Sequence, residues 1–177
     1  FAVVVTWACL AMAGGLMLQV LSQGPISYHL GGWEPPWGIE YRVDAVNAFI
    51  LILVSLIGAV VLLYAPASIE AELPEARASL FYTAYLLCFT GLLGMTITGD
   101  AFNVFVFLEV SSLSTYALIA MGTDRRALAA SFQYLIMGTI GATFFVIGIG
   151  LLYMMTGTLN MADMATRLQP VLATRTV

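Results

Sequence analysis

Lysine is absent from this chain of 177 residues, and only 9% of the residues are charged. All six basic residues are arginines, and none of them falls in the middle of an apolar run. Nucleic-acid-binding domains carry clustered Lys and Arg on one face. The chain has no such patch, so we expect no nucleic-acid partner.

Cysteine and histidine are also scarce. Cys9 and Cys88 lie inside apolar runs and lack the spacing of metal ligands. We therefore expect no metal site, and nothing in the sequence indicates a bound cofactor. His29 is the single histidine, and we interpret it as an exposed residue of a connection rather than as part of a proton relay.

Apolar residues, by contrast, make up 61% of the chain, and the mean hydropathy is +0.97. Soluble domains contain about 45–50% apolar residues. The composition predicts a multi-pass all-α integral membrane protein, because helices satisfy their own backbone hydrogen bonds in lipid. We expect it in the cell (inner) membrane. Barrel strands would alternate in polarity over about 10 residues, whereas the apolar runs here are continuous.

Five spans are predicted, each close to the length of about 20 residues that crosses a bilayer. They cover residues 1–21, 45–64, 79–98, 101–122 and 128–155. The first begins with Phe and has no basic leader, so we expect a span that starts upstream rather than a signal peptide. Pro66 predicts the end of the second span. With a C-terminal segment at 156–177, the chain forms one partial transmembrane domain, 1–177.

The connection between the first two spans predicts a short β-hairpin outside the membrane. Residues 26–30 and 39–43 alternate in polarity around a turn that contains Pro35 and Pro36. Trp33 and Trp37 are expected at the headgroup level, where tryptophan is enriched.

The next connection is acidic, with Glu70, Glu72 and Glu75 outnumbering Arg77, and we interpret it as a solvated loop. Arg125 and Arg126 follow the fourth span, and basic residues in short loops favour the cytoplasm. That orientation places the acidic loop inside and the hairpin and C-terminal segment outside. The six arginines divide equally between the two sides, so charge alone leaves the topology open.

Glu109 is the one charged residue in the middle of a span. A carboxylate at bilayer depth costs about 2.5–3.5 kcal/mol on insertion scales. An intramembrane acid of this kind typically handles protons or ions, and we interpret Glu109 as a proton acceptor and donor. The alternative is a neutral Glu109 that is held by a neighbouring helix purely for packing.

Two residues can support Glu109, because helical spacing puts them on the same face. Ser112 lies one turn away and Tyr116 two turns away. Asp100 lies nine residues before Glu109, about half a turn out of phase, so the two acids do not share a face. We interpret Asp100 as the N-cap of the fourth helix. Small residues are expected to let the helices approach closely: Gly91, Gly94, Gly138, Gly141, Ala142, Gly148 and Gly150.

Residues 99–110, GDAFNVFVFLEV, followed by STYAL at 114–118, resemble the GD-x-FN-x-FVF-x-E-V segment of the D subunits of Mrp-type multisubunit monovalent cation/proton antiporters. The likeness continues through residues 31–44, 134–142 and 156–163. These subunits are related to the antiporter-like membrane subunits of respiratory complex I.

The resemblance implies a larger antiporter-like bundle of about fourteen helices, with two inverted five-helix repeats. Its fifth helix carries an acidic residue, matched by Glu109, that pairs with a lysine on the seventh helix. The spans here then correspond to the second through sixth helices, and the lysine-bearing helices lie beyond Val177.

We therefore predict a proton-translocating membrane subunit of a multisubunit Na⁺/H⁺ antiporter, whose partners are the other subunits, protons, a monovalent cation and lipid. One alternative is a proton-pumping membrane subunit of an NADH:quinone oxidoreductase, which would belong to a redox-driven enzyme rather than a secondary transporter. A third is a scaffold subunit of a membrane assembly. Cation selectivity, stoichiometry and the cation site do not follow from the sequence.

Overall fold

Five long helices make up most of the protein in the computed structural model, which describes residues 1–169 and, of residues 75 and 76, only the backbone. All five are long and apolar enough to cross a membrane. They are α1 (Ala2–Gln23), α2 (Ala45–Glu72), α3 (Glu75–Ile97), α4 (Ala101–Ala120) and α5 (Arg125–Thr156). The expectation of an all-α, multi-pass membrane protein is confirmed.

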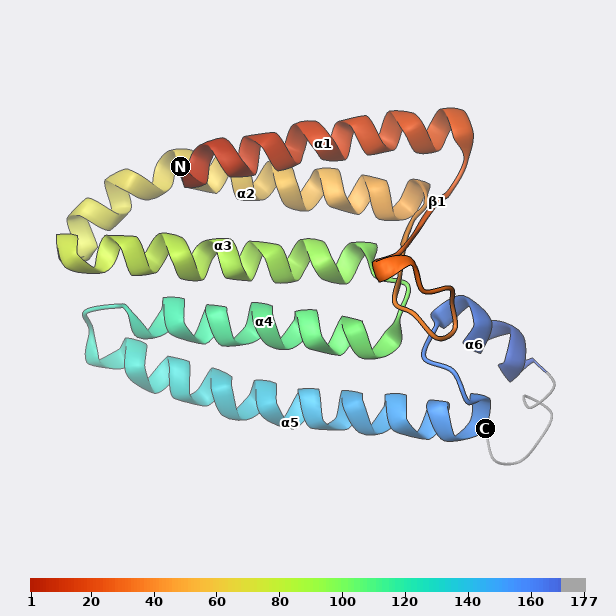
Figure 1. The fold of residues 1–177 in the computed structure, drawn as a ribbon. Helices are drawn as coiled ribbons and strands as arrows, with labels where there is room; N and C mark the ends of the chain where they lie inside the picture. The colour runs from red at the N-terminus through yellow and green to blue at the C-terminus, as the bar shows by residue number, and fades with distance from the viewer. Residues whose placement is uncertain (170–177) are drawn as a thin grey trace.

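The helices follow one another back and forth, and each packs mainly against its neighbours in sequence (Figure 1). Glycines bring some of them close: a Cβ atom on Gly91 of α3 would lie 2.7 Å from the carbonyl oxygen of Phe107 on α4. Gly138 of α5 likewise makes room for the hydroxyl of Tyr116 on α4. The expected role of small residues holds there, but Gly141, Gly148 and Gly150 have open space beside them.

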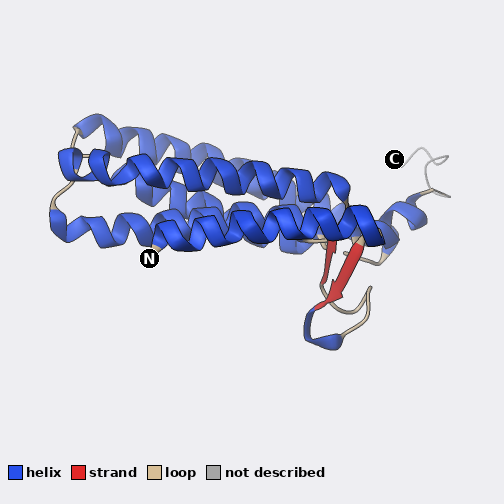
Figure 2. Ribbon diagram, turned by 90° about the horizontal axis from the view of Figure 1, so that it is seen from above, coloured by secondary structure: helices blue, strands red, loops and turns tan. Residues whose placement is uncertain are grey.

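The predicted hairpin is present as β1 (Ile26–His29) and β2 (Glu40–Val43), which pair antiparallel with Ile26 opposite Val43. A short 3-10 turn, η1 (Leu30–Gly32), follows β1. The hairpin extends sideways from one end of the helices (Figure 2). Trp33 and Trp37 are 69% and 89% exposed near its tip. His29 lies in the hairpin opposite Glu40, as expected, but it is half-buried rather than exposed.

Pro66 does not end the second helix, contrary to the prediction. Proline removes one backbone donor and kinks a helix rather than always ending it, and Figure 1 shows the last turns of α2 bending away. Ala65 and Ile69 remain buried against Leu62 and Ala2, which stabilises the continuation. The acidic segment that was expected as a loop is therefore mostly helical, and Leu73 and Pro74 alone separate α2 from α3.

A short sixth helix, α6 (Met161–Leu168), was not predicted within the C-terminal segment. It lies at the end of the molecule that carries the hairpin, which we call the hairpin end (Figure 1). The remainder of that segment, residues 170–177, falls outside the described residues. The α2–α3 and α4–α5 connections lie together at the opposite end, which agrees with the expected sidedness of the loops.

Candidate functional site

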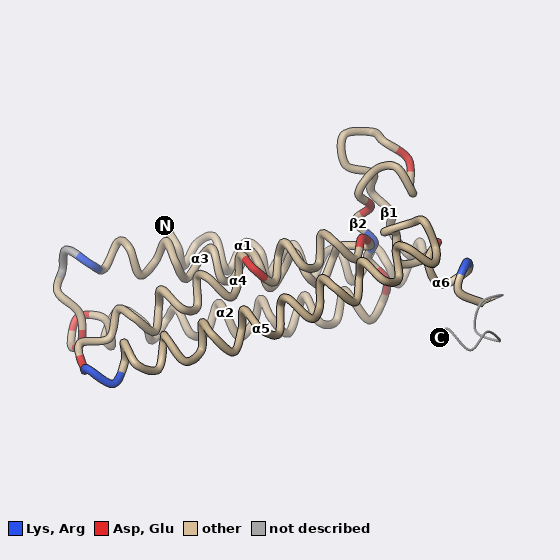
Figure 3. Tube along the Cα trace, turned by 90° about the horizontal axis from the view of Figure 1, so that it is seen from below, with Lys and Arg blue, Asp and Glu red and all other residues tan. Residues whose placement is uncertain are grey.

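Glu109 lies at mid-length of α4, half-buried. Figure 3 shows the other acidic and basic residues of the described chain gathered at the two ends of the bundle, apart from this one acidic position. Helix α4 contains no other charged residue. The isolation of the carboxyl group from other charges along the span is thus a property of the fold as well as of the sequence.

The side of α4 that carries Glu109 is the side toward α5. One turn before it, Phe105 packs against the cluster that Ala101 forms with Ile149 of α5 and Met164 of α6. Two turns after it, Tyr116 contacts Gly138 of α5. The opposite side of α4 faces α3, where the backbone of Phe107 contacts Gly91.

Tyr116 and Ser112 share this stripe of α4, but neither hydroxyl group forms a hydrogen bond with Glu109 within residues 1–169. Tyr116 is 8% exposed, and its ring meets that of Tyr134 edge-on with centroids 5.2 Å apart. The hydroxyl of Ser131 donates to the backbone oxygen of Tyr116 at 2.8 Å. In this structure Tyr116 joins α4 to α5, and Ser112 stays one turn from the acid without a bond to it.

Glu109 also borders an open face of α4. Val106 and Leu113, one turn to either side of it, are 40% and 55% exposed. An ionisable group inside a membrane faces protein or water rather than lipid. We therefore expect the open face with Val106 and Leu113 to contact a further helix or a water-filled space.

A second polar cluster, which the sequence did not predict, occupies the hairpin end. It joins three connections that are far apart in the chain: Glu40, Thr98, Asp100, Thr158 and Asn160. We call this set of five buried residues the polar clasp. The backbone N–H of Gly99 donates to the oxygen of Glu40 at 2.7 Å, and that of Met161 donates to the oxygen of Gly99 at 2.8 Å. The clasp fixes the start of α4 against the hairpin.

Glu40 is the best-bonded acid of the clasp. The hydroxyl of Ser27 and the side-chain amide of Asn160 donate to its two oxygens at 2.6 and 2.7 Å. Burial raises the pKa of Glu40, but these hydrogen bonds and the charges of Arg42 and His29 outweigh it, so the pKa lies below its ordinary value. The carboxylate is therefore ionised at neutral pH and holds the hairpin in place.

Asp100 is confirmed as the N-cap of α4, because its carboxylate accepts a hydrogen bond from the backbone N–H of Asn103 at 2.7 Å. It is 8% exposed. Burial raises the pKa of this carboxyl group, and hydrogen bonds from the backbone of Asn103 and Phe102 oppose the rise only in part. The pKa of Asp100 is thus raised, whereas the pKa of Glu40 is lowered.

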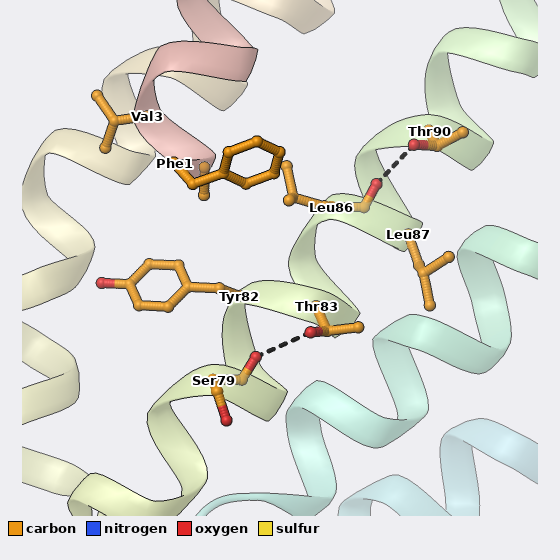
Figure 4. A pocket seen from close by; sticks show the side chains of 9 residues that line it. Phe1, Val3, Ser79, Tyr82, Thr83, Leu86, Leu87 and Thr90 are labelled. Carbon is orange, nitrogen blue, oxygen red and sulfur yellow. Dashed lines mark hydrogen bonds between the residues drawn. The ribbon is translucent and has the colours of Figure 1, made fainter.

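The remaining polar features offer less chemistry. A cavity of about 650 Å³ lies between α1 and α3, but the hydroxyl groups of Thr83 and Thr90 turn back to carbonyl oxygens of their own helix at 2.9 and 2.7 Å (Figure 4). Cys88 lies 3.3 Å from the hydroxyl of Thr115 between α3 and α4. Among residues 1–169, no group of three acidic, histidine or cysteine side chains is arranged to hold a metal ion.

Comparison with known proteins shows which family of membrane proteins this chain resembles. Residues 98–176, which include Glu109 and Asp100, match the family described as "NADH:quinone oxidoreductase/Mrp antiporter, TM". The N subunit of the NADH-quinone oxidoreductase of Desulforudis audaxviator is 44% identical over 97% of this chain and 34% of that protein. The D subunit of the Na⁺/H⁺ antiporter of Bacillus subtilis is 33% identical over 90% of this chain and 32% of that protein.

Solved structures give the same result. The Mrp complex from Dietzia contains a chain that is 27% identical, with a TM-score of 0.82 over 97% of this chain and 34% of that chain. The membrane-bound sulfane sulfur reductase, an archaeal respiratory membrane complex, contains one that is 34% identical, with a TM-score of 0.80 over 94% of this chain and 34% of that chain. The chain spans about a third of the length of the curated relatives that it matches.

Proposed function

The chain belongs to the family of membrane subunits that NADH:quinone oxidoreductases and Mrp antiporters share, and on this premise we propose that it is part of the proton-translocating subunit of a multisubunit Na⁺/H⁺ antiporter. Glu109 is the group that takes up and releases the proton. One observation carries the proposal: this acid sits alone at mid-length of a span whose other residues are uncharged. The other subunits of the complex are the partners.

The chemistry follows from the surroundings of the carboxyl group. An apolar environment favours the neutral acid, and a positive charge brought close favours the carboxylate. In this proposal, a positive charge that approaches Glu109 triggers the release of its proton. Within residues 1–169 the arginines lie at the ends of the bundle, so the trigger is a positive charge from outside this segment, such as the lysine that the family resemblance implies.

The open stripe beside Glu109 is where that charge arrives. Val106 and Leu113 leave this side of α4 uncovered by the described helices. Ser112 lies within one turn and can hold a water molecule against the carboxyl group. Tyr116 keeps α4 and α5 together through Gly138 and Tyr134, which fixes the height of Glu109 in the membrane.

A second candidate is a proton-pumping subunit of a redox-driven quinone oxidoreductase. The 44% identity to the oxidoreductase N subunit, against 33% to the antiporter D subunit of Bacillus subtilis, favours it. The local chemistry of Glu109 is the same in both, but the source of energy differs. A scaffold role, in which Glu109 is paired only for packing, is the third.

Glu109→Gln in the full-length subunit, assembled in its complex and placed in vesicles, tests the proton role. We expect cation-dependent proton movement to disappear while the complex still assembles, because Gln keeps the size of Glu but cannot release a proton. Glu70→Gln, an exposed acid near the end of α2, is the matched control and should behave like the wild type. Near-normal exchange by assembled Glu109→Gln complex would refute the role, and loss of assembly would favour the scaffold.

The source of energy separates the first two candidates. Vesicles that contain the wild-type complex receive either a sodium gradient or an electron donor with quinone. Proton movement driven by sodium alone supports the antiporter, whereas a requirement for electron transfer supports the oxidoreductase.

A further inference from the structure

Two short links at the hairpin end are built in the same way. Thr98, Gly99 and Asp100 connect α3 to α4, and Gly157, Thr158, Leu159 and Asn160 connect α5 to α6. In each link the threonine hydroxyl accepts from the backbone N–H two residues later, at 3.3 Å. The last residue of each link caps the helix that follows, and Asp100 and Asn160 pair with each other as an antiparallel bridge.

The comparison of the links shows that capping in this position requires no charge. The neutral side chain of Asn160 accepts from the backbone N–H groups of Ala162 and Asp163 at 3.1 and 3.0 Å. Asn and Asp are about equally good helix caps. Asp100 nevertheless carries a carboxylate that is only 8% exposed and forms no ion pair within residues 1–169. Burying an unpaired charge costs free energy, so capping alone does not account for the acid.

Asp100 differs from Asn160 in its access to a cavity. A space of about 400 Å³ lies between the tip of the hairpin and the end of α5. Asp100 lines it together with Trp37, Phe102, Tyr153, Thr158 and Arg167. A water molecule takes up about 30 Å³ in the liquid, so the cavity has room for several.

The charged groups around the cavity leave Asp100 free to titrate. Arg167 of α6 is held by Asp163, with 2.9 Å between their charged atoms, and it also donates to the backbone oxygen of Thr156. Glu40 of β2 bonds to the other link through Asn160. Tyr153 of α5 lines the cavity, and Thr98, in the same link as Asp100, is neutral. Burial raises the pKa of the Asp100 carboxyl group above its ordinary value.

We propose that Asp100 is a second proton-accepting group, which exchanges protons with water in this cavity on the hairpin side of the membrane. The carboxylate takes one proton from hydronium, which leaves water and the neutral acid, and it returns the proton in the reverse step. The inference rests on the proposed proton translocation and adds a station about 13 Å along α4 from Glu109.

Asp100→Asn in the full-length subunit of the assembled complex tests the assignment. The amide keeps the cap but cannot bind the exchanged proton. We expect normal assembly, a fall of about tenfold in the rate of proton movement, and a shift of about one unit in its dependence on the pH of the hairpin side, since one unit of pH is a tenfold change in proton supply.

Asp44→Asn is the matched control. Asp44 caps α2 by accepting from the backbone N–H groups of Val46 and Asn47, both at 2.9 Å, and it lies outside the cavity. This variant removes the same charge from the same kind of cap and should keep the wild-type pH profile.

An Asp100→Asn complex with the wild-type rate and pH profile would overturn the assignment. If Glu109→Gln still abolished exchange in that case, the proposed function would stand without Asp100. Should Asp100→Asn fail to assemble, Asp100→Ser supplies a second neutral cap. Failure of both would overturn the proposal as well, because the charge would then be required for folding.

Discussion

The side-chain amide of Asn160 donates a hydrogen bond of 2.7 Å to the carboxylate of Glu40, across 120 positions of the sequence. Both residues are buried, with 3% and 9% of their surface exposed. One belongs to the hairpin and the other to the link between α5 and α6. This single contact ties the first connection of the chain to the last one described.

Glu40→Gln should weaken the protein at neutral pH and remove part of its sensitivity to acid. The pKa of Glu40 is depressed in the folded protein. A carboxyl group with a depressed pKa stabilises the folded protein fully above the pKa that it has in the unfolded chain, about 4.5. This stabilisation is lost as the pH falls through the pKa that the group has in the folded protein. The melting temperature of the purified complex should therefore differ between wild type and variant at about pH 7 and converge in acid.

Glu70→Gln is the control for that experiment, since it removes an exposed acid with the same change of charge. It should melt at the wild-type temperature across the pH range. A constant difference between Glu40→Gln and the wild type at every pH would show that the Glu40 carboxylate does not act through its ionisation.

Gly91→Ala should separate α3 from α4. The new Cβ would lie 2.7 Å from both the carbonyl oxygen of Phe107 and the backbone nitrogen of Ser111, and backbone atoms cannot move aside cheaply. Overpacking of this kind costs about 1–3 kcal/mol. Gly141→Ala adds the same methyl group to α5 where nothing lies within 4 Å. Thermal unfolding in detergent should show a loss for the first variant only, and equal melting temperatures would contradict the close approach.

Ser55→Ala should leave the stability unchanged or raise it. Ser55 is 1% exposed, and its hydroxyl has no hydrogen-bond partner within the described residues. A buried polar group without a partner costs about 1–3 kcal/mol. Ser131→Ala makes the same chemical change at a hydroxyl that donates to Tyr116, and it should destabilise. The two melting temperatures, compared with the wild type, test the pair, and a clear loss from Ser55→Ala would contradict the unpartnered hydroxyl.

Much of the fold followed from local patterns. Uninterrupted apolar runs predicted the five spans, and alternation around Pro35 and Pro36 predicted the hairpin, because both depend on neighbours in sequence. Pro66 was misread, since a proline kinks a helix whose further turns are held by packing, and Ile69 supplies that packing. The start of α6 carried a signal that was overlooked: Asn160 is a favoured N-cap residue, and Asp163 places an acid in the first turn.

The candidate site was likewise predictable where it depends on local sequence and not where it depends on contacts between distant residues. Glu109 stood out in the sequence because one acid in an apolar span is costly, and its role remains a prediction, as do those of Ser112 and Tyr116. The clasp did not stand out, since Glu40 and Asn160 become neighbours only when four intervening helices return the chain to the same place. A carboxylate in a connection reads as solvated until the packing around it is known.

The bond between Glu40 and Asn160 also records how the chain has crossed the bilayer. Glu40 follows α1 and Asn160 follows α5, with α2, α3, α4 and α5 between them. An even number of crossings returns the chain to the same side of the membrane, and the failure of any one of these four spans to insert would leave the two residues on opposite sides. The bond between Glu40 and Asn160 can therefore form only after α2, α3, α4 and α5 have all crossed the membrane.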